Sequence, residues 1–467
     1  MFNMLIHYFY PKMNKEDVKK FSLLALIFML IIGAYWALRV LKDTIFFKVA
    51  FPESLGWAFN QGTLFQPIAK TLSPFVVLVL VLIYSKLIDI FKKHQLFYII
   101  CSFYAVIFAL LTIILFINDH YGAQILGKEI LAFAGWASYF AVESFGSLAS
   151  ALFWSFTNSI TTSESAKEGF PIVISFAQIA AIAGAGMLFF SDKIGSLWPI
   201  LLCATILVSL IIPIVRYFMQ VIPAQNLVGN KEAAKTEKKK EGFLEGFFSG
   251  IWLLLTRPYL IGVLIISTAY EAIAQIIEYQ MKNQASCNEA YCSVLGFARF
   301  QSIYGMSINA VSFLIAFLGT SKILQKYGTR IALLIYPISF FIALSLMLIY
   351  YLLLGSSNPS SLLWLTFAIM VIVKGMGYAV NNPTKEIMYI PTSKDAKFKS
   401  KGWIDTFGSR FAKLAGAQVT NTFKYSVSDL MLYGTLFGFG LNFIWFFAAL
   451  YVGKKNTQLL KEGKIIE

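Results

Sequence analysis

Positively charged side chains occur inside segments of this chain that are otherwise apolar. Arg39 and Lys42 close one such segment, Lys374 lies within another, and Arg410 and Lys413 lie within a third, weaker one. A single cation at the centre of a bilayer costs about 2.5–3.5 kcal/mol on insertion scales, so such groups usually face a bundle interior or a water-filled cavity. Several of them together could bind a polyanion. These residues therefore predict a binding site for a phosphate-rich solute.

The spacing of the cations favours pairs on one helix face. Arg39 and Lys42 are three residues apart, as are Arg410 and Lys413, so each pair would present two positive charges together. A structural alternative exists for the cations near the ends of their apolar segments, which are Arg39, Lys42 and Lys282. Long basic side chains at such positions can extend to the lipid headgroups without any part in binding.

Carboxylates accompany the cations. Glu143 is enclosed by apolar and aromatic neighbours, so its carboxylate must pair with a cation or bind a proton. Glu271 and Glu278 are seven residues apart and would share a helix face. Glu278 and Lys282 are four apart and could form an ion pair.

An amide follows a run of aromatic residues in the segment LFWSFTNSITT (152–162). Aromatic stripes on a helix usually serve packing. Asn158 could nonetheless hydrogen-bond to the edge of a nucleobase, with the neighbouring rings available for stacking. We include Asn158 among the candidate binding residues.

The composition places these residues in a membrane protein. Of the 467 residues, 58% are hydrophobic and 13% are charged, whereas soluble domains carry about 25% charged residues. The net charge of +15 lies in short clusters between apolar runs, and no nucleic-acid-binding motif accompanies it. We expect the lipid bilayer, and no nucleic acid, as a partner.

Apolar segments of bilayer length predict about twelve transmembrane helices. They lie at residues 20–41, 64–85, 95–117, 130–155, 168–190, 195–218, 257–281, 299–321, 330–354, 360–381, 403–423 and 429–452.

A polar, Lys-rich stretch divides these segments into six and six. We predict an N-terminal half at residues 1–219, a linker at 220–245 and a C-terminal half at 246–467, with an amphipathic surface helix at 247–255. The predicted class is an all-α integral membrane protein of the major-facilitator type, whose halves move around a central site. Lysine and arginine cluster in the linker, the even-numbered loops and both termini, which predicts that both termini are cytoplasmic.

Cysteines and histidines give no metal site. Cys287 and Cys292 lie in a short polar loop that this topology places outside the cell, where a disulfide between them is permitted. No phosphate-binding loop or hydrolase motif occurs in the chain. We therefore expect no enzyme activity and no cofactor, and transport driven by a gradient or by exchange.

Four stretches resemble the ATP/ADP translocase family of obligate intracellular bacteria and plastids. They are ALRVLKD (37–43), the segment 141–167 around LFWSFTN, KGMGYAVNNPTKEIMYIP within 374–402, and IDTFGSRFAKLAGAQ (404–418); IIEYQMK (276–282) is a weaker match. The resemblance implies a twelve-span fold that exchanges host ATP for ADP plus phosphate in the inner membrane of an intracellular bacterium or parasite.

The family's functional charged positions correspond to Lys42, Glu143, Glu278 and Lys413 in this sequence. Chemistry and motif position add further candidates, which are Arg39, Asn158, Lys282, Lys374 and Arg410. We expect a monomer. We also expect obligatory exchange, because an empty site would leave uncompensated charges at low dielectric.

Departures from the family pattern leave the substrate open. Lys413 is followed by Leu-Ala-Gly where the family has Ser-Gly-Gly, and Met281 replaces a tryptophan. One alternative is proton-coupled net import of a nucleotide or NAD, with Glu271 or Glu278 carrying the proton. A second alternative is a polytopic membrane protein that transports nothing.

Overall fold

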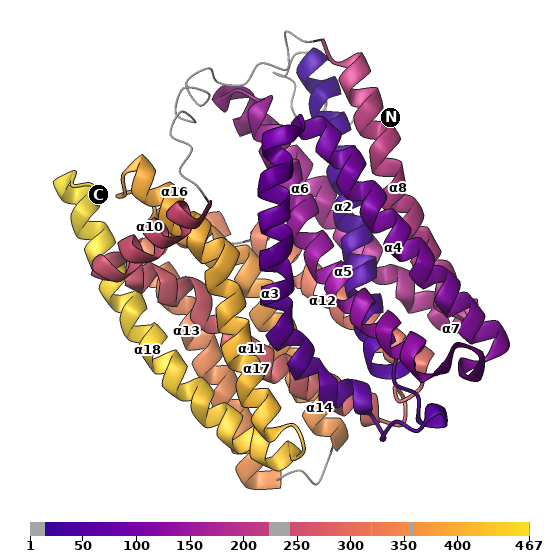
Figure 1. Ribbon diagram of the computed structural model, residues 1–467. Helices are drawn as coiled ribbons and strands as arrows, with labels where there is room; N and C mark the ends of the chain where they lie inside the picture. The colour runs from indigo at the N-terminus through magenta and orange to yellow at the C-terminus, as the bar shows by residue number, and fades with distance from the viewer. Residues whose placement is uncertain (1–14, 224–242, 319, 355–358, 467) are drawn as a thin grey trace. The chain divides into compact units, whose positions relative to one another are not determined.

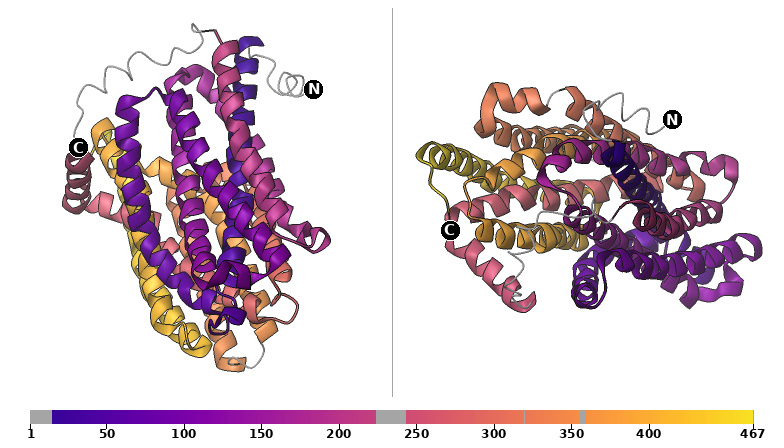
Figure 2. Two further views of the ribbon diagram at one scale, coloured as in Figure 1. Left: turned by 45° about the vertical axis from the view of Figure 1, so that its right-hand side comes forward. Right: turned by 90° about the horizontal axis from the view of Figure 1, so that it is seen from above.

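The chain is helical through nearly all of its described length. The computed structural model describes residues 15–223, 243–318, 320–354 and 359–466 (Figure 1). Within these residues no strand is present, although Thr392 and Ile466 form an isolated bridge. Further views show coiled ribbons from the side and from above (Figure 2).

The α-helices follow one another along the chain. They are α2 (Lys15–Thr44), α3 (Gln61–Ile90), α4 (Lys93–Tyr121), α5 (Ala123–Ser159), α6 (Ser163–Gly186), α7 (Ser191–Ile194), α8 (Trp198–Val221), α10 (Phe243–Thr256), α11 (Pro258–Cys287), α12 (Val294–Leu318), α13 (Thr320–Leu354), α14 (Pro359–Met376), α15 (Asn382–Met388), α16 (Lys394–Trp403), α17 (Ser409–Phe423) and α18 (Val427–Glu462). Three π-helical segments, η1 (Ile45–Val49), η5 (Gly377–Asn381) and η6 (Ile404–Gly408), continue α2, α14 and α16.

Local sequence accounts for several helix ends. Pro258 occupies the first turn of α11, where its missing N–H is not needed. Ser426 caps α18, since its hydroxyl accepts a hydrogen bond of 3.1 Å from the amide of Asp429. Gly463 ends α18 in the left-handed conformation, with φ +63°. α10 ends before Pro258 and covers the surface helix predicted at 247–255.

The predicted spans fall on these helices, and the all-helical membrane class is confirmed. In the described part of the chain, nine helices are long and apolar enough to cross a membrane. The remaining three predicted spans lie on α12, on α14 with η5, and on η6 with α17. Gly328, with φ +72°, interrupts α13 close to the predicted start of its span.

Two compact units make up the chain. The first comprises Met1–Gly62, Phe75–Lys240 and Ser293–Met306, and the second comprises Thr63–Pro74, Glu241–Cys292 and Ser307–Glu467. Residues 63–74 thus group with later helices, and 293–306 with earlier ones. Most of the linker predicted at 220–245 lies outside the described residues. The division into six and six helices remains a prediction.

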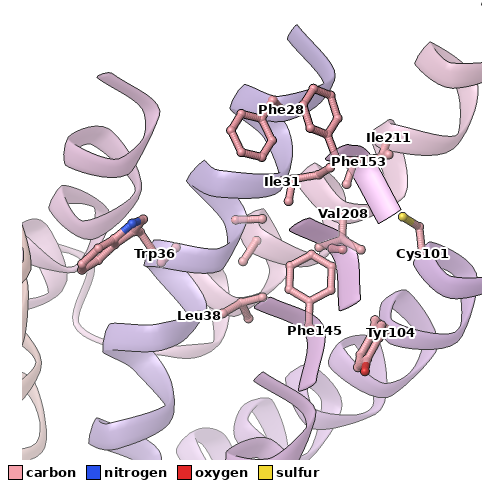
Figure 3. Packing of buried hydrophobic residues seen from close by; sticks show 14 of the residues in the cluster. Phe28, Ile31, Trp36, Leu38, Cys101, Tyr104, Phe145, Phe153, Val208 and Ile211 are labelled. Carbon is pink, nitrogen blue, oxygen red and sulfur yellow. The ribbon is translucent and has the colours of Figure 1, made fainter. Parts of the chain in front are cut away.

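The first unit is built around α2. This helix packs against α5, α6 and α8, and its apolar side chains fill the centre of the cluster (Figure 3). Phe28 of α2 stacks on Phe153 of α5, with 4.3 Å between ring centroids. Ile31 is fully buried in the same cluster. α2 is therefore held on several sides, which fixes the position of any charge at its end.

The second unit is built around α11, which packs against α14, α17 and α18. Trp445 of α18 is fully buried and lies against the rings of Tyr336 and Phe340 from α13. A long central helix contacted by several others is common to both units.

The contact between α2 and α6 gives a test of the packing. A Cβ at Gly184 would lie 2.9 Å from the carbonyl carbon of Gly33. Because Gly33 contributes main-chain atoms, this clash could be relieved only if one helix shifted. We expect Gly184→Ala to destabilise the protein by about 1–3 kcal/mol, measured as a lower thermal unfolding midpoint in detergent. Gly440→Ala is the matched control, because nothing lies within 4 Å of its added methyl group. Equal midpoints for both variants would contradict this packing.

Candidate functional site

A buried ion pair joins α2 to α5 in the first unit. The ammonium of Lys42 contacts the Glu143 carboxylate, and their side chains are 4% and 22% exposed. Asp43 Oδ1 lies 3.9 Å from the same ammonium, and the Tyr139 ring centroid lies 4.6 Å from it. Because the Lys42 side chain is buried against these groups, it does not extend to the lipid headgroups, as the alternative without a binding role required.

Close helix packing brings these two residues together. A Cβ on Gly146 of α5 would lie 2.6 Å from Cδ2 of the Tyr35 ring on α2, so only glycine leaves room for this ring. Tyr35 lies two turns before Lys42, and Gly146 lies one turn after Glu143. The contact of Tyr35 with Gly146 fixes how the two helices align and thereby sets Lys42 against Glu143.

The other two candidates of the first unit lie elsewhere. Arg39 is half-buried one turn before Lys42, and its guanidinium carbon lies 4.7 Å from the Trp36 ring centroid. Asn158 is exposed, near the end of α5. It follows Glu143 by four turns, which is about 22 Å along the helix. Asn158 therefore does not join the ion pair, and the preceding Phe153 stacks in the core. A binding role for Asn158 remains a prediction.

One carboxylate holds two lysines in the second unit. Glu278 Oε1 lies 2.7 Å from Lys282 Nζ, so the pair anticipated from their spacing on α11 is present. Glu278 Oε2 lies 3.2 Å from Nζ of Lys374, which α14 supplies. The side chain of Lys282 is 6% exposed, and those of Glu278 and Lys374 are 12% exposed. This group of three is buried within the protein and carries one net positive charge.

A second, looser pair links α11 to α17. Lys413 Nζ lies 3.6 Å from Glu271 Oε1, and the Tyr270 hydroxyl donates a hydrogen bond of 2.9 Å to the same oxygen. The lysine side chain is 39% exposed, whereas the glutamate is 12% exposed. A solute can therefore reach this ammonium more easily than its partner. Arg410 is half-buried one turn before Lys413 on the same helix.

Glycine again determines the approach of the helices. A Cβ on Gly416 of α17 would lie 3.1 Å from both the Cα and the carbonyl carbon of Ala272 on α11. Ala272 follows Glu271 directly, and Gly416 follows Lys413 by one turn. The main chains can come this close only without a side chain at 416, and the pair of Glu271 with Lys413 follows from that approach.

Two side chains near this pair are absent from the predicted site. Tyr270 holds the Glu271 carboxylate, and Lys385 of α15 places its ammonium 5.8 Å from the Tyr270 ring centroid. Glu271 itself was predicted only as a proton carrier in one alternative. The Thr-Lys of the segment that resembles the family could have pointed to Lys385, but the role of Tyr270 had no sequence pattern to indicate it.

Each π-helical segment lies next to a candidate cation. η1 starts three residues after Lys42, η5 starts three residues after Lys374, and η6 ends two residues before Arg410. A π turn carries an extra residue, and such turns are frequent at functional sites because they re-aim the side chains beside them. Their placement supports a functional reading of these three cations.

The arrangement can bind an anion by exchange of counter-ions. Lys42, Lys374 and Lys413 each have a carboxylate within ion-pair distance. A phosphate oxygen carries the same kind of charge and accepts the same hydrogen bonds as a carboxylate. An incoming phosphate could therefore take the place of a glutamate at any of these lysines.

The predicted disulfide is not formed in the structure. Cys292 Sγ lies 3.4 Å from the carbonyl oxygen of Glu289, and Cys287 Sγ lies 3.8 Å from the hydroxyl of Ser286. A disulfide between these cysteines remains a prediction.

Sequence comparison matches nearly the whole chain to one family. The model of the family described as "TLC ATP/ADP transporter" matches residues 1–454. "ADP,ATP carrier protein 1" of Rickettsia typhi is 26% identical, over 97% of this chain and 96% of that protein. The protein of the same name from Chlamydia pneumoniae is 25% identical, over 90% of this chain and 87% of that protein.

Solved structures with a similar fold are also transporters. A mutant of the nucleoside transporter NupG aligns with a TM-score of 0.59 at 13% identity, over 93% of this chain and 99% of that one. A bacterial homologue of the iron transporter ferroportin, in its inward-facing state, aligns with a TM-score of 0.61 at 12% identity, over 92% and 98%. The expected major-facilitator-like fold is confirmed.

The pair of Lys42 with Glu143 can be tested by a double-mutant cycle. We expect Lys42→Gln and Glu143→Gln each to destabilise the protein by about 3–5 kcal/mol, because each removes one partner of a largely buried ion pair. The double variant should lose less stability than the sum of the two single losses, because both substitutions remove the same interaction, although the buried Asp43 then lacks Lys42. Unfolding in detergent measures all four proteins. Additive losses in the double variant would show that the two side chains do not interact.

Proposed function

The chain belongs to the TLC ATP/ADP transporter family, and from this membership we propose that it exchanges external ATP for internal ADP plus phosphate by alternating access. The chain is a membrane transporter and not an enzyme. The relatives named above are ADP,ATP carriers, which makes ATP and ADP the first substrates to consider. The observation that carries the proposal is the set of ion-paired lysines within or beside predicted spans.

The ion pairs change the physical account of the unloaded protein. Obligatory exchange was expected because an empty site would leave bare positive charges, but Lys42, Lys374 and Lys413 each have a carboxylate partner. The proposal of exchange therefore rests on the family membership and not on uncompensated charge. Substrate phosphates must then compete with these carboxylates. Each displacement exchanges one anion for another, so binding avoids the large cost of leaving a buried charge unpaired. Moderate affinity, which release requires, follows from that competition.

The ion pairs differ in how readily a phosphate would displace the carboxylate from its lysine. Lys413 is the most exposed of the three lysines. The carboxylate of its partner Glu271 accepts a hydrogen bond from the Tyr270 hydroxyl, which keeps it in place when the lysine turns to a phosphate. Lys374 shares Glu278 with Lys282, so that group keeps one excess positive charge. We infer that Lys413 meets the incoming phosphates first and that the Glu278 group supplies the more deeply placed charge.

ATP and ADP differ by about one charge near neutral pH, because each added phosphate ionises. Carboxylates released by substrate could balance this difference within the protein. The proposal therefore needs the acids as much as the lysines, and Glu143, Glu271 and Glu278 become part of the transport machinery. We further propose that the protein acts as a monomer in an inner membrane, with both termini cytoplasmic.

Proton-coupled net import of a nucleotide or NAD is the second candidate. It is favoured by one observation, the buried Glu271 carboxylate with its tyrosine donor. A carboxylate at this depth can carry a proton. The family membership argues against the third alternative, a membrane protein without transport activity.

Uptake of labelled ATP into proteoliposomes tests the exchange directly. We expect rapid uptake into vesicles loaded with ADP, little uptake into empty vesicles, and no effect of a protonophore. Loss of uptake on adding the protonophore, with equal rates in loaded and empty vesicles, would instead establish proton-coupled import. Competition by GTP, CTP and NAD in the same vesicles defines the substrate range.

Single substitutions test the lysines. We expect Lys42→Ala, Lys374→Ala and Lys413→Ala each to abolish uptake of ATP when uptake is divided by the amount of folded transporter in the membrane. Removing one partner of a buried charge pair at a binding site costs about 2–5 kcal/mol, which corresponds to about 30-fold or more in affinity. Lys193→Ala is the control, because this exposed lysine lies against the Phe190 ring and pairs with no buried acid. Normal transport by all three variants would refute the role of the ion pairs.

A further inference from the structure

In the second unit, a basic pocket lies where α11 begins and α18 nears its end. Its volume is about 400 Å³, which falls in the usual range for small-molecule sites, about 300–1,000 Å³. Arg257 and Lys455 supply its charge, Tyr259 and Tyr451 line it, and the C-terminal residues Ile465 and Ile466 close one side. None of these belongs to the proposed transport machinery.

The floor of the pocket is fixed by hydrogen bonds. Tyr259 is 3% exposed, and its hydroxyl donates to the carbonyl of Met388 at 2.7 Å. The same hydroxyl accepts a hydrogen bond of 2.9 Å from the amide of Asn456 on α18. These two bonds tie α11 to α18 and to the end of α15, so the pocket is a built feature of the second unit.

The chain's C-terminal segment forms a further wall. After the turn at Gly463, the amide of Ile466 donates to the carbonyl of Pro391 at 2.9 Å, and the amide of Ser393 donates to the carbonyl of Ile466 at 2.8 Å. The segment is therefore held in place by main-chain bonds. Its side chains at 465 and 466 add an apolar lining beside the two cations.

The residues that line the pocket include two cations and no acid. Among the residues that the structure describes, neither Arg257 nor Lys455 forms an ion pair with a carboxylate; Lys455 contacts only the Gln458 amide oxygen, at 3.4 Å. Glu462, the next acid along α18, pairs with Lys464 at 2.9 Å and also interacts electrostatically with Lys455. Two cations that line one pocket suit a phosphate, which accepts several charge-assisted hydrogen bonds.

Apolar side chains are exposed on segments that adjoin the pocket's residues in sequence. Trp252 and Leu255 in the last turns of α10 are 70% and 64% exposed, and Ile465 is 64% exposed. Exposed tryptophan and tyrosine beside basic side chains are typical of the membrane–water interface. A ligand with an anionic head and apolar chains matches both features, whereas a free phosphate would use only the charge.

We propose that this pocket binds the phosphate-bearing headgroup of an anionic phospholipid. Basic pockets between transmembrane helices are a recognised form of headgroup site. Arg257 would hold the phosphate through its planar guanidinium, Lys455 would add a point charge, and the acyl chains would lie along the exposed apolar side chains. None of the substrate lysines lines the pocket, so the proposal does not depend on the identity of the transported nucleotide.

Thermal unfolding of the full-length protein tests the site. In micelles containing phosphatidylcholine, added phosphatidylglycerol should raise the unfolding midpoint by about 2–4 °C. The double variant Arg257→Gln with Lys455→Gln should lose this shift, and so should Lys455→Glu, which leaves the arginine in place. Arg216→Gln with Lys454→Gln is the matched control, because it removes the same charge from exposed helix positions that do not line the pocket. The control should keep the full shift.

A comparison with inorganic phosphate decides whether the pocket binds a lipid headgroup or free phosphate. Inorganic phosphate at the same concentration should leave the midpoint unchanged. An equal shift with inorganic phosphate, lost in the double variant, would overturn the lipid assignment and make this a site for free phosphate. A shift that persists in the double variant, or no shift in the wild type, would overturn the pocket as a binding site altogether.

Discussion

The need of a buried ammonium for a counter-charge organises this protein. A lysine in an apolar bundle is tolerated only when an anion lies beside it. Lys42 and Lys374 meet this need with carboxylates from neighbouring helices, and the more exposed Lys413 is paired in the same way. The helices must therefore approach closely at these places, and the positions of the charges follow from the same contacts that hold each unit together.

Small residues make those approaches possible. Gly146 leaves room for the ring of Tyr35, and Gly416 lets α17 lie against the main chain of Ala272. Each glycine is one turn from a member of an ion pair, so packing and charge placement share one cause. A π-helical segment lies beside each of three cations, where an extra residue in the turn re-aims the neighbouring side chains.

Internal carboxylates also give a physical reason for moderate affinity. A bare cationic site would bind a nucleotide tightly and hold it, since release would restore uncompensated charge at low dielectric. With Glu143, Glu271 and Glu278 in place, release lets a carboxylate return to its lysine. Binding and release then differ by an exchange of anions, which suits a carrier that must load on one side and unload on the other.

Local sequence was sufficient for features set by neighbours along the chain. Apolar segments of bilayer length gave the helices, and a spacing of four residues gave the pair of Glu278 with Lys282. The motif stretches and the cations inside apolar segments likewise indicated the family without any coordinates.

Tertiary structure decided which acid meets which lysine. Lys42 and Glu143 are 101 residues apart, and nothing in their local sequence shows that α2 and α5 align through Tyr35 and Gly146. The same holds for Glu271, whose partner Lys413 comes from α17. Asn158 carries suitable chemistry yet lies four turns from the charges. Sequence spacing fixes the face of one helix, whereas a contact between helices depends on how closely their main chains can approach.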